Sequence, residues 1–233
     1  MKLNTNSNTY TILYAAGVVV VVAFLLAFAY AALKERSDAN ERIDKKQQIL
    51  AALNIRGLDK ADVEAKYKEV VLQDMIVDAE GNVVNEGSEQ DKAGFAVDRK
   101  DFSGQKLPLY ICQVDGQKKF VVPMTGKGLW GGIWGFVALN EDGRTVFGSY
   151  FSHESETAGL GALIKEQKFQ DEFAGKQAYA EDGAPTLTVV KSGAVQDAAT
   201  QVDGITGATL TSNGVRDMIK EYLGLYNAFL SKK

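Results

Sequence analysis

The chain opens on a long uncharged run. From Thr9 to Leu33 no residue carries a charge (TYTILYAAGVVVVVAFLLAFAYAAL). About 20 apolar residues suffice for a helix to cross a bilayer, and in hydrocarbon a helix satisfies its own backbone hydrogen bonds. Aromatic rings favour the membrane interface, and the run has tyrosines near its two ends, which are Tyr10, Tyr14 and Tyr30. We therefore predict an uncleaved membrane anchor over residues 1–33.

A cleaved signal peptide is the alternative, because AFAYAA offers small residues for cleavage. The apolar run is longer than the usual signal-peptide core of about 7–15 residues, which favours the anchor. The orientation of the anchor is a separate question. Acidic residues count little in the positive-inside rule, so charge alone favours a cytoplasmic body. The basic residues that follow the run are Lys34, Arg36, Arg42, Lys45 and Lys46.

Two helices follow the anchor. The segment SDANERIDKKQQILAALNI has apolar residues at helical spacing and is followed by Gly57. It predicts a connecting helix within residues 34–58. The segment LDKADVEAKYKEVVL predicts a second helix, with Asp59 as the N-cap. Its apolar face consists of Val63, Tyr67 and Val70.

Short apolar runs separated by turn residues then predict strands. DMIVDAEGNVV is typical of a hairpin around Gly81, and the polar residues 85–106 are predicted to be a loop or an insertion. LPLYICQV turns at Asp115–Gly116 into KKFVVPM, and GIWGFVAL turns through residues 140–143 into RTVFGSYF. An Asp-Gly pair between two such runs is a strong hairpin signal.

The last part of the chain mixes helices with a strand. LIKEQKFQDEFAGK predicts a helix with Phe169 and Phe173 inward, and PTLTVVK predicts a strand. SNGVRDMIKEYLGLYNAFL predicts the final helix, capped by Ser212 or Asn213. The chain is thus predicted to be α+β, with a single N-terminal transmembrane helix and one domain over residues 59–233. In that domain helices flank a mostly antiparallel sheet.

Composition excludes several kinds of site. A net charge of −4 and the absence of a basic stripe argue against a nucleic-acid partner. Cys112 is the only cysteine and lies in an apolar run, which excludes an intrachain disulfide and a cysteine metal cluster and predicts a buried side chain. His153 is the only histidine, in a polar context that predicts an ordinary loop residue. The acidic residues are predicted to be scattered surface charges. We predict no metal site and no complete catalytic set on this chain.

Glycine-rich stretches are the candidates for binding. They are TGKGLWGGIWG, ESETAGLGA and DGITGATLTSNG, and each lies where a strand ends or a helix begins. Backbone amides at a helix start attract anions, and Trp130 and Trp134 could offer an aromatic wall to a flat ligand. Each stretch alone is also compatible with a simple tight turn.

Taken together, the motifs resemble a known family. DGITGATLTS resembles the flavinylation motif of FMN-binding domains, in which an aspartate precedes Ser/Thr-Gly-Ala-Thr. HESETAGLGA resembles their Glu-Thr-Pro-Gly-Leu-Gly stretch, with Ala158 in place of the usual proline. With GKGLWGGIWGFVAL and the anchor, nearly the whole chain resembles the C-subunit family of sodium-translocating NADH:quinone reductases. The G subunit of the related Rnf complex is the alternative, and the Leu129–Trp130 context favours the C-subunit family.

The resemblance implies an FMN joined through its phosphate to Thr209, with Thr211 as the second choice. Gly207 and Ala208 would keep side chains away from the phosphate. Asp203 would be recognised by the flavin transferase that attaches the cofactor. The remaining residues expected along the flavin are Leu129, Trp130, Glu156, Thr157, Gly159, Leu160 and Gly161.

The implied function is electron relay through covalent FMN inside a membrane NADH:quinone reductase of the bacterial inner membrane. The resemblance implies a periplasmic domain, against the charge rule. The other proteins of the complex and the lipid bilayer would be its partners, and NADH would react on one of those proteins because this chain has no dinucleotide fingerprint. Two other functions stay open from the residues alone. They are a membrane-anchored binding protein for a free phosphorylated ligand and a structural membrane adaptor.

Overall fold

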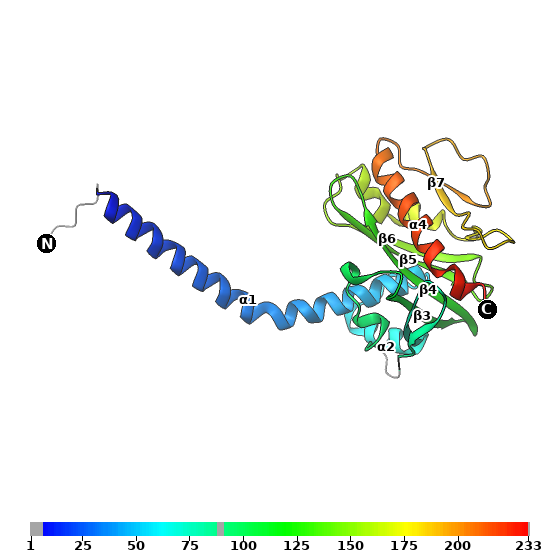
Figure 1. Cartoon of the computed structure of the whole chain (residues 1–233), viewed down its shortest axis with the longest axis horizontal. Helices are drawn as coiled ribbons and strands as arrows, with labels where there is room; N and C mark the ends of the chain where they lie inside the picture. Colours follow the sequence, from blue (N-terminus) through cyan, green and yellow to red (C-terminus); the bar gives the residue numbers. More distant parts are fainter. Residues whose placement is uncertain (1–6, 88–90, 233) are drawn as a thin grey trace. The chain divides into compact units, whose positions relative to one another are not determined.

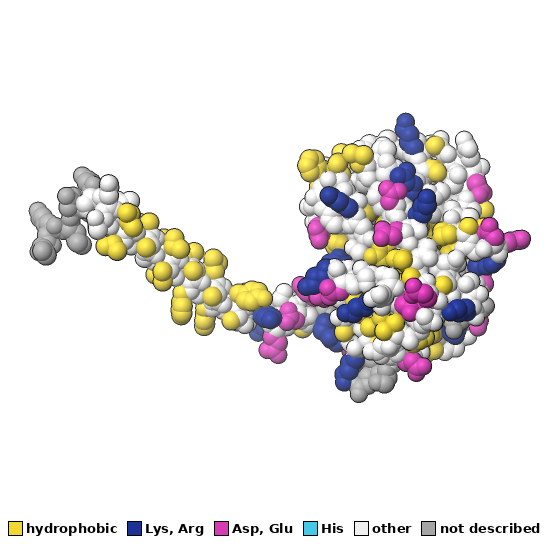
Figure 2. Space-filling model, in the orientation of Figure 1, with side chains coloured by type: hydrophobic (Ala, Val, Ile, Leu, Met, Phe, Trp, Pro, Cys, Tyr) yellow, Lys and Arg dark blue, Asp and Glu magenta, His cyan; other side chains and the backbone are white. Residues whose placement is uncertain are grey.

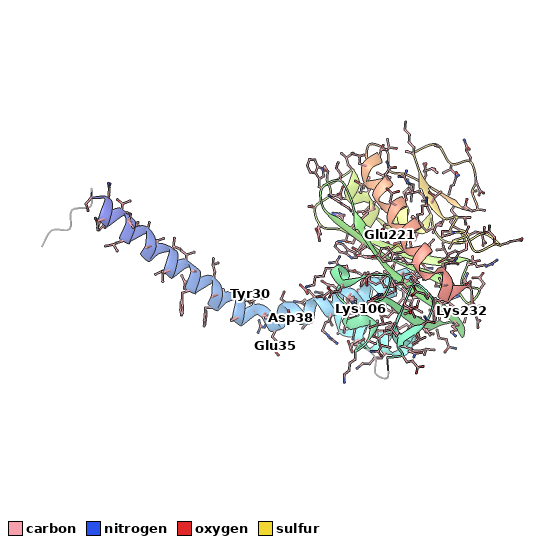
Figure 3. The ribbon with its side chains drawn as sticks, viewed as in Figure 1. Tyr30, Glu35, Asp38, Lys106, Glu221 and Lys232 are labelled. Atoms are coloured by element: carbon pink, nitrogen blue, oxygen red, sulfur yellow. The ribbon has the colours of Figure 1, made fainter. Side chains whose placement is uncertain are left out.

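The structure is a computed structural model that describes residues 7–87 and 91–232. It begins with helix α1, Asn8–Ala52 (Figure 1). The predicted anchor and connecting helix are one continuous helix, because no glycine or proline interrupts residues 34–52. Figure 3 shows Tyr30, Glu35 and Asp38 in succession along α1, where apolar side chains give way to charged ones. Among the described residues, α1 alone is long and apolar enough to span a membrane.

Internal contacts divide the chain into residues 1–45 and 46–233. The last turns of α1 therefore belong to the second unit, in which Ile49, Leu50 and Ala52 are fully buried. The boundaries at residues 33 and 58, between the anchor, the connecting helix and the domain, remain a prediction.

Helix α2, Lys60–Val70, starts as predicted after Asp59, although the Asp59 side chain makes no capping hydrogen bond. The helix was expected to continue to Leu72, but strand β1, Val71–Val77, follows it directly. β-branched residues lose side-chain freedom in a helix and favour strands, and Val70 and Val71 stand at this junction. The hairpin is confirmed: β1 pairs with β2, Val83–Asn85, and Gly81 at the turn has φ +79°.

Residues 85–106 are more ordered than a loop. They contain the end of β2 and two 3-10 turns, η1 (Gly94–Ala96) and η2 (Arg99–Asp101), while residues 88–90 lie outside the described part. The buried Asp74 carboxylate holds this segment by accepting backbone N–H groups of Asp91, Ala93 and Phe95. The burial of Asp74 corrects the prediction that the acidic residues are scattered surface charges.

The predicted meander is confirmed, and its strands are β3 (Leu107–Val114), β4 (Gln117–Lys127), β5 (Gly132–Asn140) and β6 (Val146–His153). With the first hairpin they form an antiparallel sheet in the order β2-β1-β3-β4-β5-β6. Asp115 and Gly116 both have positive φ at the β3–β4 turn, as a tight hairpin requires.

The two faces of the sheet carry separate apolar groups. Leu107 and Leu109 pack in one core with residues of helix α4, Thr209–Leu230. Tyr110 and Cys112 are also fully buried, and helix α2 contacts β3 as well as β1. Successive strand residues point to opposite faces, so α4 covers one face and α2 the other. The prediction of a buried Cys112 is confirmed, and burial raises the pKa of its thiol.

The segment after β6 differs from the predicted helix over residues 163–176. It forms a 3-10 turn, η3 (Gly161–Lys165), and the short helix α3 (Gln167–Asp171). Glu166 has an extended backbone (φ −72°, ψ 139°), which separates the two elements. Phe169 and Phe173 are buried as predicted, and the Phe173 ring lies 4.9 Å from that of Phe151. The predicted strand at 185–191 shortens to β7 (Thr188–Val190), which pairs in parallel with β8 (Gln201–Asp203).

Candidate functional site

Three glycine-rich loops lie near the start of helix α4, and a carboxylate in the second of them binds the first loop and the helix. They are the β4–β5 turn at residues 128–131, the loop at 154–160 that follows β6, and the loop at 204–208 that precedes α4. Glu156 Oε1 accepts the backbone N–H of Trp130 at 2.8 Å. Its Oε2 accepts the hydroxyl of Thr211, in the first turn of α4, at 2.6 Å. These two hydrogen bonds bring together three of the predicted site residues, Trp130, Glu156 and Thr211.

Glu156 is buried, with 7% of its surface exposed. Burial alone would raise the pKa of its carboxyl group. The hydrogen bonds from the Thr211 hydroxyl and from the amides of Trp130 and Gly131, with the nearby His153, outweigh burial and lower that pKa. Glu156 is therefore an anion at neutral pH.

Glycines surround this carboxylate because no side chain would fit beside it. A Cβ on Gly161 would lie 2.5 Å from Thr211 Oγ1 and would collide with Glu156 Oε2 as well. A Cβ on Gly128 would lie 2.5 Å from Glu156 Oε1. These distances are shorter than van der Waals contact, so the β4–β5 turn and the start of η3 approach the carboxylate this closely only with glycine at these positions.

Helix α4 begins at Thr209, which differs from the predicted cap at Ser212 or Asn213. Ala208 is the N-cap and makes no side-chain capping bond, and the Ser212 amide donates to its carbonyl at 2.9 Å. Ser212 lies inside the first turn, where its Oγ accepts the Ile205 N–H at 3.0 Å and braces the preceding loop. The helix starts early because Gly207, at φ +79°, turns the chain directly into it.

The two candidate threonines have opposite environments. Thr209, the first residue of α4, is exposed. Thr211 is buried, with 1% of its surface exposed, and its hydroxyl proton is donated to Glu156. The first amides of a helix have no partner within the helix and attract negative charge. An anion attached to Thr209 would lie beside these amides.

Large apolar side chains near these loops are exposed. Leu160 adjoins Gly207, where a Cβ would lie 3.0 Å from its Cδ2. Figure 2 shows hydrophobic side chains gathered on the surface of the domain. Such exposed apolar groups mark binding surfaces. We call these residues the apolar rim, and they are Leu129, Trp130, Leu160 and Leu210, with exposed fractions of 46, 66, 41 and 60%.

Trp134 is not part of this rim, contrary to the aromatic wall considered from the sequence. Its Nε1 donates to Gln48 Oε1 at 2.9 Å, and the Arg99 guanidinium lies 3.7 Å from its ring. Gly135, the next residue of β5, lies against Phe151. Because successive strand residues face opposite ways, Trp134 belongs to the face that packs on the last turns of α1.

The other predicted residues lie in or beside the same loops. The Thr157 carbonyl accepts the amides of Leu160 and Ala162 at 3.1 Å, and Gly159 has φ +74°. Asp203 ends β8, and its carboxylate accepts the Gly193 N–H at 2.7 Å. His153 is not a loop residue as predicted: it ends β6, and its Nδ1 accepts the Glu156 N–H at 3.2 Å. No described group of His, Cys, Asp and Glu side chains is arranged to hold a metal ion.

Comparison with known proteins defines the class. The FMN-binding domain family matches residues 128–224, a range that contains all three loops. The C subunit of the Na(+)-translocating NADH-quinone reductase from Vibrio alginolyticus is 32% identical over 249 aligned residues, covering 100% of this chain and 97% of that protein. The corresponding protein from Pseudomonas aeruginosa is 31% identical, and the alignment covers 98% of this chain and 97% of that protein. The chain belongs to the C-subunit family of Na(+)-translocating NADH-quinone reductases.

Solved structures agree with this assignment. The C subunit from Parabacteroides distasonis, whose crystal structure is known, is 35% identical in sequence. The structures superpose with a TM-score of 0.78, over 86% of this chain and 98% of that chain. The NqrC structure from Shewanella oneidensis, at 23% identity and a TM-score of 0.69, shows the same fold. The predicted fold class, an N-terminal apolar helix followed by an antiparallel sheet with helices, is confirmed.

Proposed function

We propose that this chain relays electrons within a sodium-translocating NADH–quinone reductase, and that its FMN is joined by a phosphoester to Thr209. The exposed Thr209 hydroxyl at the start of α4, beside a Thr211 hydroxyl that is already engaged, is the observation that carries the attachment site. Matches to C subunits over the full length of the chain support this family over the Rnf G subunit. Protein-bound FMN supplies electron-transfer chemistry, and the protein supplies binding, orientation and electrostatics.

The residues present fit an FMN phosphate and ring. The first amides of α4, which have no partner within the helix, would attract a phosphate on Thr209, and Gly207 and Ala208 place no long side chain beside it. The apolar rim offers surface for a flat aromatic ring, because burying apolar area is favourable. Both carboxylate oxygens of Glu156 accept hydrogen bonds from the protein, one from the Trp130 amide and one from the Thr211 hydroxyl. We therefore do not include Glu156 among the residues proposed to contact the flavin ring.

Attachment requires an activated flavin donor and an enzyme. The Thr209 Oγ forms a bond to the flavin phosphorus, while the bond from that phosphorus to the bridging oxygen of a diphosphate breaks. The leaving phosphate takes the electron pair, and a base of the flavin transferase takes the hydroxyl proton. We propose that the transferase recognises Asp203, since this residue ends β8 directly before the loop that leads to Thr209. Asp203→Asn would then lower attachment without unfolding the domain.

The mass of the denatured protein tests the attachment. After coexpression with a flavin transferase, the wild type should carry one FMN phosphoester that survives denaturation and fluoresces in a gel. Thr209→Ala should lose it, and Ser231→Ala, which removes an exposed hydroxyl at the other end of α4 and outside the motif, should keep it. Loss in Thr211→Ala with retention in Thr209→Ala would move the acceptor to Thr211. Flavin that leaves on denaturation would favour the binding protein for a free phosphorylated ligand.

We also propose that the domain lies in the periplasm, as the family resemblance implies. Cys112 is buried, so the wild type should resist a membrane-impermeant maleimide. Lys106, labelled in Figure 3, is exposed, and Lys106→Cys should be labelled on intact cells. Labelling only after the inner membrane is opened would place the domain in the cytoplasm, as the charges around α1 favour.

A further inference from the structure

Resting on this proposed function, we infer that Glu156 is a positioning residue: its carboxylate fixes the β4–β5 turn to the first turn of α4, and flavin attachment requires that arrangement. The family motif places Glu156 among the residues along the flavin. The structure turns both of its oxygens inward, toward the Trp130 amide and the Thr211 hydroxyl. Because each oxygen of this carboxylate already accepts a hydrogen bond, Glu156 affects the site by positioning Trp130 and Thr211.

The carboxylate is held in place by its surroundings. It is buried, and the imidazole Nδ1 of His153 accepts the Glu156 amide and fixes the backbone. Gly128 and Gly161 approach it so closely that a Cβ at either position would collide with its oxygens. Charge-assisted hydrogen bonds are stronger than neutral ones, and this carboxylate is an anion with a lowered pKa.

Each arm of the bridge ends next to a residue of the candidate site. The Oε1 arm holds Trp130, whose exposed ring belongs to the apolar rim. The Oε2 arm holds Thr211, two residues after the acceptor Thr209. The bridge therefore sets where the rim stands relative to the acceptor hydroxyl. Displacing reacting groups by about 1 Å can cost on the order of a hundredfold in rate.

Glu154 provides a matched control in the same loop. Its Oε2 accepts the amide of Gly132, the first residue of β5 after the same turn, at 3.1 Å, but the side chain is exposed and this hydrogen bond does not reach α4. Glu154→Ala removes the same charge from the same loop and leaves the bridge to α4 intact. Glu156→Gln provides the rescue, because its amide oxygen can accept from Trp130 while its nitrogen donates to Thr211 Oγ1.

The test measures the rate of attachment of FMN to the full-length apo-protein in detergent, by mass, with flavin transferase and an activated flavin donor. Glu156→Ala and the isosteric Thr211→Val should each slow attachment by about tenfold or more. Glu156→Gln and Glu154→Ala should stay within about threefold of the wild type. Hydrogen exchange of the Trp130 amide, measured on the apo-protein, should accelerate in Glu156→Ala and not in Glu154→Ala.

Several outcomes would overturn the inference. Wild-type attachment rates in Glu156→Ala, at temperatures where thermal unfolding shows it folded, would do so. Equal slowing by Glu154→Ala would do so too, because loop charge rather than the bridge would then be the cause. If Glu156→Ala does not fold, wild-type rates in Thr211→Val would have the same effect. A wild type that takes up no denaturation-resistant flavin would instead contradict the proposed function.

Discussion

Lys46 Nζ lies 2.5 Å from the carboxylate of Asp91, and only 2% of the lysine side chain is exposed. Glu64 of α2 lies 2.7 Å from the same nitrogen, and the rings of Tyr67 and Phe95 flank it at 4.8 and 5.4 Å. In the sequence, Lys46 is one of several basic residues after the apolar run. In the structure it is an internal cation that joins the end of α1 to α2 and to the segment after β2.

Replacing Lys46 by methionine should destabilise the domain strongly. The substitution keeps an apolar stem of similar length but leaves the carboxylate of Asp91 without this cation, and breaking a buried ion pair costs about 3–5 kcal/mol. Lys68→Met is the matched control, because Lys68 is exposed and lies 3.3 Å from the same Glu64. An exposed pair contributes about 0–1 kcal/mol. Urea unfolding of both variants measures the difference, and equal losses would contradict an internal role for Lys46.

Truncations should distinguish the anchor from the part of α1 that belongs to the domain. A chain starting at residue 34 should be soluble and unfold cooperatively. A chain starting at residue 53 loses Ile49 and Leu50, which are fully buried. Each large apolar side chain contributes about 1.5–3 kcal/mol when buried, so this chain should unfold at a much lower temperature or aggregate. Equal thermal unfolding of the two fragments would show that residues 34–52 are dispensable.

The sequence predicted the elements that depend on local signals. The strands of the meander are short apolar runs bounded by turn residues, and Asp115–Gly116 carries its own turn geometry, so both can be predicted from the sequence. The start of α4 was misplaced because a serine and an asparagine are good caps in isolation, whereas here Gly207 begins the helix earlier and Ser212 serves the preceding loop.

What could not be predicted depends on contacts between distant residues. The burial of Asp74 follows from amides 17 to 21 positions further along the chain. The bridge from Glu156 to Thr211 spans 55 positions. The glycines at 128 and 161 were visible as candidate turn residues, but the reason for them, a carboxylate that fills the space of a Cβ, exists only in the folded chain.

Two glycine-to-alanine substitutions should change stability in opposite directions. Gly161→Ala drives a methyl group into Glu156 Oε2 and Thr211 Oγ1, so it should destabilise the fold by about 1–3 kcal/mol. Gly224 lies inside α4 with no heavy atom within 4 Å of an added Cβ. Gly224→Ala should therefore stabilise by about 0.5–1 kcal/mol. Chemical denaturation gives both values, and a stabilising Gly161→Ala would disprove the packing described around Glu156.

The Glu156 bridge should weaken in acid. A carboxyl group with a folded-state pKa below its unfolded value binds protons more readily when unfolded, so its contribution is present above the unfolded pKa and is lost as pH falls through the folded one. An ordinary glutamate has a pKa of about 4.3. The stability difference between the wild type and Glu156→Gln should thus be constant near neutral pH and shrink below about pH 4.3. A difference that grows in acid would have the wrong sign.

The electron-relay role is tested on membranes that carry the assembled complex with Thr209→Ala. Quinone reduction should fall by orders of magnitude, because a relay without its cofactor interrupts the path, while NADH oxidation by an artificial acceptor should remain largely intact. This separation is expected because the chain contains a candidate flavin site but no dinucleotide fingerprint. Ser231→Ala, at the exposed far end of α4, keeps the motif, the acceptor Thr209 and the Glu156 bridge, so it should retain both activities. Normal quinone reduction by Thr209→Ala would refute the relay role. Loss of both activities would indicate that Thr209 is needed for assembly of the complex, and the amount of each protein of the complex in the same membranes would show this directly.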